Sequence, residues 1–580
     1  MKNDWKDKLV TAHDVLQYIK PGMNIFIGSG TAEPRTLVKS LIESGLSDVN
    51  DLEVIQLTTH SDFFSLKELD YQKYKLKTIL STWVSSEAVV AGSVDLIPAR
   101  ISQLPRIIKS NRIPIDVAFI QITPPDEAGY CSLGVAVDIA REAMERADMV
   151  VGEINPDIPF TFGDTIVSIS DFNLLVESTE PPTYTKRRPI RRNIDQVAAN
   201  IAQIIKDGDC ISLMTGPLFD AVGRHLVHKR HLGIHSAFFT DALMDLVKSG
   251  AVTNYRKALY RGKSVASYAL GTRKLMRWLD RNPLVEFQSV EQVFDPIQIG
   301  RIPNFVVVDE AHKVDLLGRM AFSAGKNDII SGPSKAADLF TGADISRGGR
   351  TIIGLPSRNK QGAPNIVVML RNLRNQFHMR ESIDAVVTEY GIANLKWRTI
   401  RERAQAIIDI AHPEDRQKLV EDAKQKKLLF EDQIFLAESA RLYPMEVATE
   451  HEMGNGLQVR FRPIKPSVGH YLGWQCHRLH EFEYRHEGWP SPLSRRAGKE
   501  GIHGVPVYDT VVRLGLQQMG GDAAHHLSGP DDEGSLWKRS GLGDGLISQV
   551  DGHCSWMIVL GIVFDPFQLV RLDPNFGVLL

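Results

Sequence analysis

Cysteine is scarce in this chain of 580 residues. The four cysteines, Cys131, Cys210, Cys476 and Cys554, are far apart and form no CxxC pair. This spacing excludes a disulfide scaffold and the common zinc motifs. His477 and His480 beside Cys476 fit no zinc spacing either. We therefore expect a reducing, cytoplasmic environment and no metal site.

The chain also lacks a large net charge and a long apolar run. Its formal charge is −2 and its isoelectric point about 6.8, which argues against a nucleic-acid or anionic-membrane partner. The longest apolar run, WMIVLGIVF (Trp556–Phe564), is too short to span a bilayer as a helix. The N-terminal MKNDWKDKLV lacks the apolar core of a secretory signal. We expect a soluble protein.

Short apolar segments alternate with amphipathic ones up to about residue 445. MNIFIGSG, LEVIQLTT, VAFIQIT and MVVGEI are typical of buried strands, and segments such as PRTLVKSLIES and DIAREAMERA have helical periodicity. This alternation predicts an α/β fold with parallel sheets covered by helices.

An internal repeat is visible within this region. IKPGMNIFIGSGTAEP (Ile19–Pro34) aligns without gaps on IKDGDCISLMTGPLFD (Ile205–Asp220), so that Gly30 meets Gly216. We predict two related open α/β domains, residues 1–185 and 186–445. The Pro- and Arg-rich segment Ser178–Arg192 is expected to link them.

The segment LGIHSAFFTDAL (Leu232–Leu243) is typical of a buried strand, a tight bend and the start of a helix. Bends of this kind present reactive side chains in α/β enzymes. Ser236 and Ala237 are expected to lie at this bend.

Four stretches together carry a resemblance to a known family. They are TPPDEAGYCSLGVAVDIAREA (Thr123–Ala143), GIHSAFFTDALMDLVKSGAVTN (Gly233–Asn254), YALGTRKL (Tyr268–Leu275) and VVTEYGIANLKWRTIRERAQAIIDIAHPEDR (Val386–Arg416). Over residues 5 to about 445 the chain resembles the acetyl-CoA hydrolase/CoA-transferase family, including the 4-hydroxybutyrate and acetate CoA-transferases. The resemblance implies two CoA-transferase (NagB/RpiA-like) domains with the site between them. It also implies coenzyme A or acyl-CoA and a small carboxylate as substrates, and we expect a homo-oligomer.

The family's chemistry uses a glutamate that attacks the acyl-CoA thioester and then carries CoA as a glutamyl thioester. In GIHSAFFTDA the residue at this glutamate position is Ala237, whose methyl group cannot attack a thioester. The family's asparagine, which stabilises the oxyanion, corresponds to Phe294. The resemblance therefore implies a CoA-transferase framework without its usual nucleophile.

Other positions implied to contact CoA are partly kept. The family's GxGG loop retains only Gly332 and has Ser334 and Lys335 where glycines are usual, whereas the turn MTGPLFDAV on the phosphate side is better matched. The predicted CoA-binding residues are Gly30, Gly216, Ala221, Val222 and Gly332.

Two acidic residues could replace the missing nucleophile as a base for hydrolysis. Glu33 follows the first glycine turn, and Glu310 could pair with His312 if both lie on one strand. For Glu33 the structural alternative is a carboxylate that stabilises the start of a helix. For Glu310 and His312 it is a strand that ends in a solvated bend. Ser236 lacks a base, because His235 would project to the opposite face.

Three further function classes remain open. One is a non-catalytic acyl-CoA-binding or regulatory protein, in which Lys335 or Arg347 could pair with CoA phosphates. A dinucleotide-dependent dehydrogenase is disfavoured, because GSGTAEP lacks the third glycine of GxGxxG. An acetyltransferase is the third, since LQVRFRPIKPS (Leu457–Ser467) resembles the first strand of a GNAT domain, within residues 446–467.

The composition changes after residue 467. Residues 468–580 contain two lysines against seven arginines, and eight of the 18 histidines, without a sustained period of 2 or 3.6. The GNAT-like segment before this tail offers a single strand, and one strand cannot hold acetyl-CoA, which disfavours the acetyltransferase. We interpret residues 468–580 as a poorly structured tail, and our hypothesis is that it is the product of a shifted reading frame.

Overall fold

The computed structural model describes residues 4–44, 51–57, 74–78, 92, 94–322, 334–370, 376–377 and 379–433. The predicted GNAT-like strand and the tail after residue 467 lie outside the described residues. The description below therefore concerns the α/β part of the chain.

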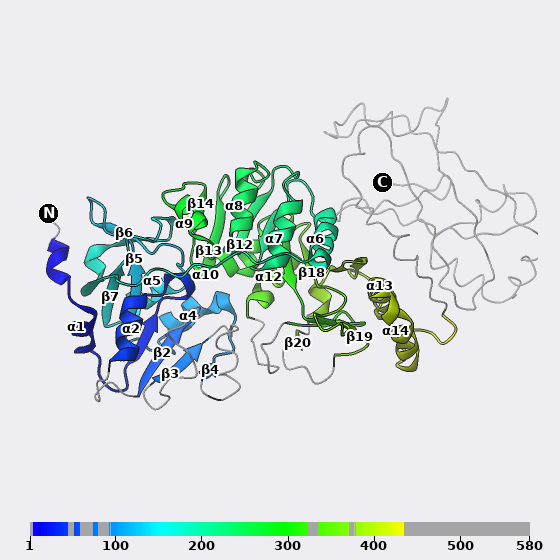
Figure 1. Cartoon of the computed structure of the whole chain (residues 1–580), viewed down its shortest axis with the longest axis horizontal. Helices are drawn as coiled ribbons and strands as arrows, with labels where there is room; N and C mark the ends of the chain where they lie inside the picture. The colour runs from blue at the N-terminus through cyan, green and yellow to red at the C-terminus, as the bar shows by residue number, and fades with distance from the viewer. Residues whose placement is uncertain are drawn as a thin grey trace, which may run out of the picture. The chain divides into compact units, whose positions relative to one another are not determined.

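The first sheet has seven parallel strands in the order β10-β7-β5-β1-β2-β3-β4 (Figure 1, blue to cyan). They are β1 (Asn24–Ile27), β2 (Leu52–Gln56), β3 (Tyr74–Thr78), β4 (Val94–Leu96), β5 (Val117–Ile122), β7 (Met149–Ile154) and β10 (Leu174–Glu177). A separate antiparallel pair joins β6 (Tyr130–Ser132) and β9 (Ile166–Ser168).

The second sheet has nine strands in the order β22-β21-β18-β15-β11-β12-β13-β14-β8, and only β22 is antiparallel. They are β8 (Phe162–Gly163), β11 (Cys210–Leu213), β12 (Gly233–Phe239), β13 (Ser264–Ala269), β14 (Val285–Phe287), β15 (Phe305–Glu310), β18 (Arg350–Gly354), β21 (Ala385–Thr388) and β22 (Gly391–Asn394). A small sheet contains β16 (Lys313–Asp315), β17 (Met320–Ala321), β19 (Ile366–Val367) and β20 (Gln376–Phe377).

Helices cover both sheets. Those of the first half are α1 (Ala12–Leu16), α2 (Arg35–Glu43), α4 (Leu104–Lys109) and α5 (Ala140–Arg146), with 3₁₀ turns η1 (Asp4–Lys8), η2 (Gly30–Ala32), η3 (Ile101–Gln103) and η4 (Ile169–Asp171). Those of the second half are α6 (Arg192–Ile204), α7 (Pro217–His225), α8 (Asp241–Lys248), α9 (Arg273–Leu279), α10 (Val290–Phe294), α11 (Pro296–Gly300), α12 (Ser334–Ile345), α13 (Ile400–Asp409) and α14 (Pro413–Gln425), with η5 (Arg380–Ser382).

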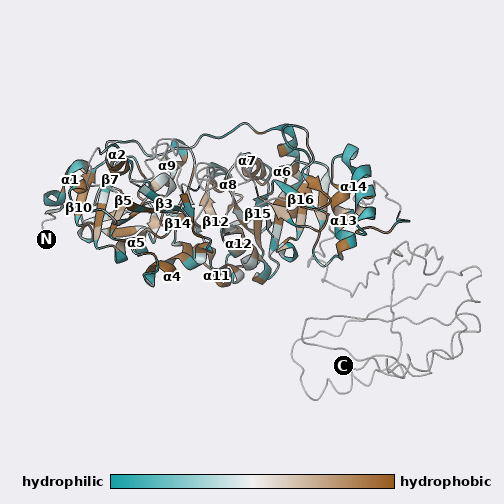
Figure 2. Cartoon of the chain, turned by 90° about the horizontal axis from the view of Figure 1, so that it is seen from below, coloured by the Kyte–Doolittle hydropathy of each residue, from teal (hydrophilic) through white to brown (hydrophobic). Residues whose placement is uncertain are grey.

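Alternating side chains of the strands fill two cores. Ile25 and Ile27 of β1 point into a cluster under α1 and α2, whereas Phe26 points into a larger cluster that also takes in the second sheet. Figure 2 shows the strands mainly in hydrophobic brown and α14 mainly in hydrophilic teal. Burial on both faces explains why the strands read as continuous apolar runs.

The internal repeat corresponds to a repeated topology. β1 and β11 occupy the same offset in the aligned repeats, with β1 between β5 and β2 and β11 between β15 and β12. The order β10-β7-β5-β1-β2-β3-β4 of the first sheet thus corresponds to β21-β18-β15-β11-β12-β13-β14 in the second. The glycines Gly22 and Gly208 both have positive φ, as do Gly30 and Gly216, which any other residue would adopt at a cost. The predicted pair of related open α/β units is confirmed.

The segment between the halves packs against both of them. The Arg35 guanidinium donates to the Pro181 carbonyl (2.9 Å), and Arg187 pairs with Asp245 (2.6 Å). In addition, β8 comes from the first half of the sequence but pairs with β14 of the second sheet. The halves are therefore joined by more than a linker, and the boundary at residue 185 stays a prediction.

Candidate functional site between the two halves

The strand that carries Ala237 is longer than its sequence predicts. β12 continues through Ser236 and Ala237 to Phe239, and the bend lies at Thr240, the N-cap of α8. The expectation that Ser236 and Ala237 lie at the bend was wrong, because parallel pairing with β13 continues to Phe239. Ala237 is completely buried, so this position presents a methyl group inside the fold.

Ser236 and His235 are both occupied by structural hydrogen bonds. The Ser236 hydroxyl donates to the Leu213 carbonyl of β11 (2.8 Å). The His235 Nε2 atom donates to the Val293 carbonyl (3.0 Å). Burial and the nearby Lys257 lower the pKa of His235 to about 3, so the ring is neutral. The two side chains project to opposite faces of the strand and cannot work as a nucleophile and its base.

Lys257 is a buried cation behind β12. Its Nζ atom donates to the carbonyls of Ile234 (2.7 Å) and Lys263 (2.8 Å), and burial lowers the pKa of its amine to about 8. A Cβ on Gly233 would lie 2.9 Å from the Lys257 stem. This close packing explains why residue 233 is a glycine.

The Lys257→Met variant tests this buried charge. The pKa of the lysine is lower in the folded protein than in the unfolded chain, so protonation favours unfolding. This penalty is full below about pH 8 and is relieved as the pH rises toward 10.5. Relative to the variant, the wild type should gain about 3 kcal/mol of unfolding free energy between pH 7 and pH 10. Urea unfolding of both proteins at pH 7 and pH 10 measures this gain. The prediction is contradicted if the wild type and the variant differ by the same free energy of unfolding at both pH values.

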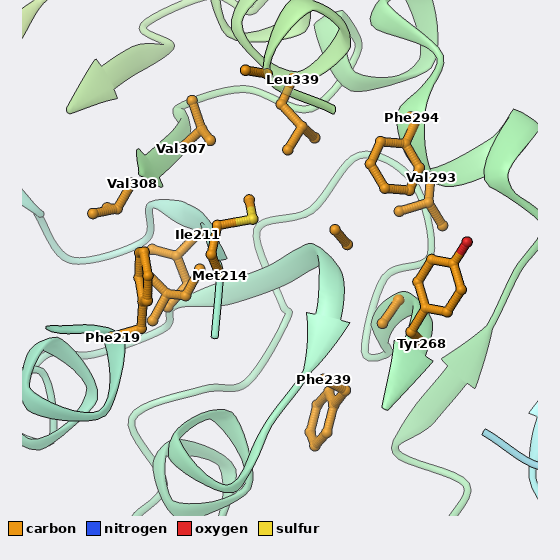
Figure 3. Packing of buried hydrophobic residues seen from close by; sticks show 14 of the residues in the cluster. Ile211, Met214, Phe219, Phe239, Tyr268, Val293, Phe294, Val307, Val308 and Leu339 are labelled. Carbon is orange, nitrogen blue, oxygen red and sulfur yellow. The ribbon is translucent and has the colours of Figure 1, made fainter. Parts of the chain in front are cut away.

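Helix α10 covers the face of β12 that carries Ala237. His235 and Ala237 are two residues apart and share one face of the strand, and His235 bonds to Val293 of α10. The next residue, Phe294, is 1% exposed and belongs to the main core cluster. Figure 3 shows Val293 and Phe294 within this packed apolar region. The two positions assigned to the family's reacting glutamate and asparagine thus both belong to the main hydrophobic core.

This region lies where the two halves meet. In the first half, the backbone N–H and the hydroxyl of Ser102 both donate to the buried carboxylate of Asp338 in α12 (2.9 Å each). η3, which contains Ser102, also contacts α10. The Thr31 hydroxyl donates to the Ala269 carbonyl of β13 (2.8 Å). A site between the halves, as the resemblance implies, is therefore compatible with the fold.

The sequence analysis did not single out Asp138, a completely buried acid at this junction. Its φ is 34°, and burial raises the pKa of its carboxyl. Its Oδ1 atom accepts from the Ile139 N–H (2.5 Å). The neighbouring backbone binds β13, since the Val137 N–H donates to the Ser267 carbonyl (3.2 Å). An aspartate just before a helical segment was the only sequence signal.

The predicted CoA-binding residues occupy different environments. Gly216 caps α7 with φ at 128°, and Gly30 begins η2 with φ at 60°. Ala221 and Val222 are completely buried in α7, so their side chains pack in the core and hold the helix that follows the Gly216 turn in place. Gly332 lies outside the described residues. Their role in binding CoA stays a prediction.

Glu33 is buried at the junction. Its side chain is 1% exposed, and its Oε2 atom accepts from the Gln56 amide at the end of β2 (2.9 Å). The residue lies just before α2. The structure therefore places Glu33 on the same loop as Thr31, which reaches β13.

Glu310 and His312 do not lie on one strand, as the sequence analysis expected. β15 ends at Glu310 and β16 begins at Lys313, so His312 lies between two strands. Both side chains are exposed. The expectation that both lie on one strand was wrong, because β15 ends two residues before His312. Among the described residues, no group of three or more His, Cys, Asp or Glu could hold a metal ion.

Comparison with known families defines the class of protein. The acetyl-CoA hydrolase/transferase N-terminal domain matches residues 1–200, and the corresponding C-terminal domain matches residues 271–423. The chain belongs to the acetyl-CoA hydrolase/transferase family.

Individual relatives are consistent with this assignment. The chain is 34% identical over 423 residues to the 4-hydroxybutyrate coenzyme A transferase of Clostridium kluyveri, covering 73% of this chain and 98% of that protein. It is 33% identical over 407 residues to the succinyl-CoA:acetate/propanoyl-CoA:succinate CoA transferase of Fasciola hepatica, covering 69% and 84%. The crystal structure of RipA from Yersinia pestis superposes with a TM-score of 0.68 at 29% identity, covering 74% and 100%. In the described part of the chain, no helix is long and apolar enough to cross a membrane.

Proposed function

We propose that this chain binds acyl-CoA in the manner of its family but does not transfer CoA through a glutamyl intermediate. The observation that carries the proposal is the burial of Ala237 and Phe294, which both belong to the main hydrophobic core. A carboxylate nucleophile and a polar oxyanion donor are both replaced by hydrocarbon. The ligands proposed from the relatives are acyl-CoA and a small carboxylate, and we further propose a homo-oligomer.

The test compares turnover with binding. Exchange of label between acetate and acetyl-CoA is expected to be about 10³- to 10⁶-fold slower than in an intact relative assayed in parallel. Borohydride should trap no enzyme-bound CoA thioester. In contrast, acetyl-CoA at 100 times its Kd should stabilise the protein by about 2.7 kcal/mol in thermal unfolding. Exchange at the rate of the relative would overturn the proposal, and so would a complete lack of stabilisation.

Slow hydrolysis is the second candidate, supported by the buried carboxylate of Glu33 on the loop that reaches β13. In this alternative Glu33 would activate a water molecule for attack on the thioester. Any acetyl-CoA hydrolysis by the wild type should then fall in Glu33→Gln and persist in Glu310→Gln, whose side chain is exposed. Equal rates in both variants would remove Glu33 as the base.

A further inference from the structure

The turn between β22 and α13 carries a tryptophan in a strained backbone conformation. The Arg398 N–H donates to the Leu395 carbonyl (3.3 Å), which closes a turn with Trp397 at its third position. The φ of Trp397 is 60°, and a positive φ at this position of a turn is typical of glycine or asparagine. A bulky side chain adopts this conformation only at a cost in free energy.

Burial does not offset this strain within the part of the chain that the structure describes. Trp397 is 93% exposed, the largest exposed fraction among the large hydrophobic residues of that part. Ile400 at the start of α13 and Phe430 after α14 are also exposed, Phe430 by 47%. We call these three residues the Trp397 patch. Large apolar side chains that gather on a surface indicate a contact site.

Arg401 of α13 joins the two parts of the patch. The central carbon of its guanidinium lies 3.6 Å from the centroid of the Phe430 ring, so the residue next to Ile400 contacts Phe430. The Arg401 Nε atom is buried and has no hydrogen-bond partner among the described residues. A buried donor without an acceptor is unfavourable. The patch therefore suits a partner that combines apolar side chains with an acidic group.

The chain after α14 follows the same face of α13, and both helices lie in the yellow-green part of Figure 1. The side-chain amide of Gln433, the last described residue, donates to the Gln405 side chain of α13 (3.0 Å). Arg401 and Gln405 are four residues apart and therefore share one face of the helix. Ile400 lies about 7.5 Å from Gln405 along the helix axis, five residues at 1.5 Å each. The described chain thus ends close to the Trp397 patch.

The ten residues that follow have the composition and the length to cover the patch. IFLAESARLY (Ile434–Tyr443) contains seven apolar residues, and ten residues reach up to about 33 Å when extended. Its one acid, Glu438, offers carboxylate oxygens to the Nε–H of Arg401. Because the segment is joined directly to Gln433, its effective concentration at the patch is higher than that of a separate partner.

We infer that the segment Ile434–Tyr443 docks on the Trp397 patch. Trp397 and Phe430 pack against its apolar side chains, and Arg401 pairs with Glu438. The docked segment buries the tryptophan that the turn otherwise exposes, and it ties α13 and α14 to the chain that follows them. The inference is independent of the proposed acyl-CoA binding.

Trypsin cleavage after Arg441 in the full-length protein tests the docking, with the fragments followed by mass spectrometry. Trp397→Gly should speed this cleavage about tenfold, because the segment must leave the patch to be cleaved and the variant removes its largest apolar contact. Glycine also suits the positive φ of residue 397, so the variant should remain folded. Trp397→Phe keeps an aromatic ring and should retain most of the protection.

The matched control is Tyr255→Ala, which removes another exposed aromatic side chain and should leave the rate of cleavage after Arg441 unchanged. Equal rates in the wild type and in Trp397→Gly would overturn the inference. Protection that increases with protein concentration would overturn it as well, because a second copy of the chain would then cover the patch.

A second measurement observes the patch from the other side. The fluorescence of Trp397 is obtained by subtracting the spectrum of Trp397→Phe from that of the wild type. This emission should resist quenching by acrylamide in the wild type. In the double variant Phe435→Ser, Leu436→Ser, measured with and without Trp397→Phe, it should be quenched more strongly. Equal quenching in both backgrounds would exclude Ile434–Tyr443 as the occupant.

Discussion

The double variant Ala237→Glu, Phe294→Asn is expected to form a covalent adduct with coenzyme A that the wild type does not form. The glutamate supplies the nucleophile, and the asparagine provides a polar donor where a phenyl ring now fills the core. Exchange of label between acetate and acetyl-CoA should rise by at least about 10³-fold over the wild type. Intact-protein mass spectrometry after incubation with acetyl-CoA detects the adduct, and borohydride reduction fixes it.

Each part of this double variant has a separate consequence. Ala237→Glu alone places a carboxyl group in a completely buried position, so it should destabilise the fold by about 2–4 kcal/mol and remain inactive. The matched control is Ala237→Gln, Phe294→Asn, which has the same size without a nucleophile. An adduct in this control, or none in a folded glutamate double variant, would contradict the assignment of Ala237.

Loss of the Arg350 guanidinium should destabilise the second half of the chain strongly. Arg350 of β18 pairs with Asp209, whose side chain is 3% exposed and also accepts from the Lys206 N–H (2.7 Å). Arg350→Met leaves this carboxylate buried without its cation. Removal of one partner from a buried pair costs about 3–5 kcal/mol, which urea unfolding at pH 7 will measure.

The pH dependence of this loss identifies its cause. Burial raises the pKa of Asp209, and Arg350 opposes that shift, so the pKa should rise further in Arg350→Met. A buried acid with a raised pKa destabilises the fold while it is charged and ceases to do so when it is protonated. The deficit of the variant should therefore shrink as the pH falls from 7 toward 5. The double variant Asp209→Asn, Arg350→Met should recover most of the stability at pH 7. If Arg350→Met is destabilised by the same amount at pH 7 and pH 5, the loss comes from packing and not from the buried charge.

Much of the fold follows from local sequence patterns. The capping box of Thr399 and Glu402 and the apolar face after it predict a helix, and α13 begins at Ile400 with both capping hydrogen bonds present. The aligned glycines of the repeat mark equivalent turns after β1 and β11. Such features depend on residues close in sequence, so one sequence is sufficient to predict them.

The length of β12 could not be predicted in the same way. Small polar and apolar residues such as Ser236 and Ala237 are compatible with a bend, and the strand persists because β11 and β13 bind it from both sides. Glu310 and His312 are the opposite case, in which strand pairing ends earlier than the apolar pattern suggests. Tertiary pairing overrides local preference at strand ends.

The sequence by itself determined the α/β class, the duplicated topology and, through the resemblance of four stretches, the family. It also determined that Ala237 and Phe294 carry no functional group at the positions assigned to the reacting ones. Only the tertiary structure decided that Ala237 shares its buried face with His235 beneath α10 and that Asp138 is enclosed at the junction. These results depend on segments far apart in the chain, whose contacts arise only when the two sheets and their helices pack together.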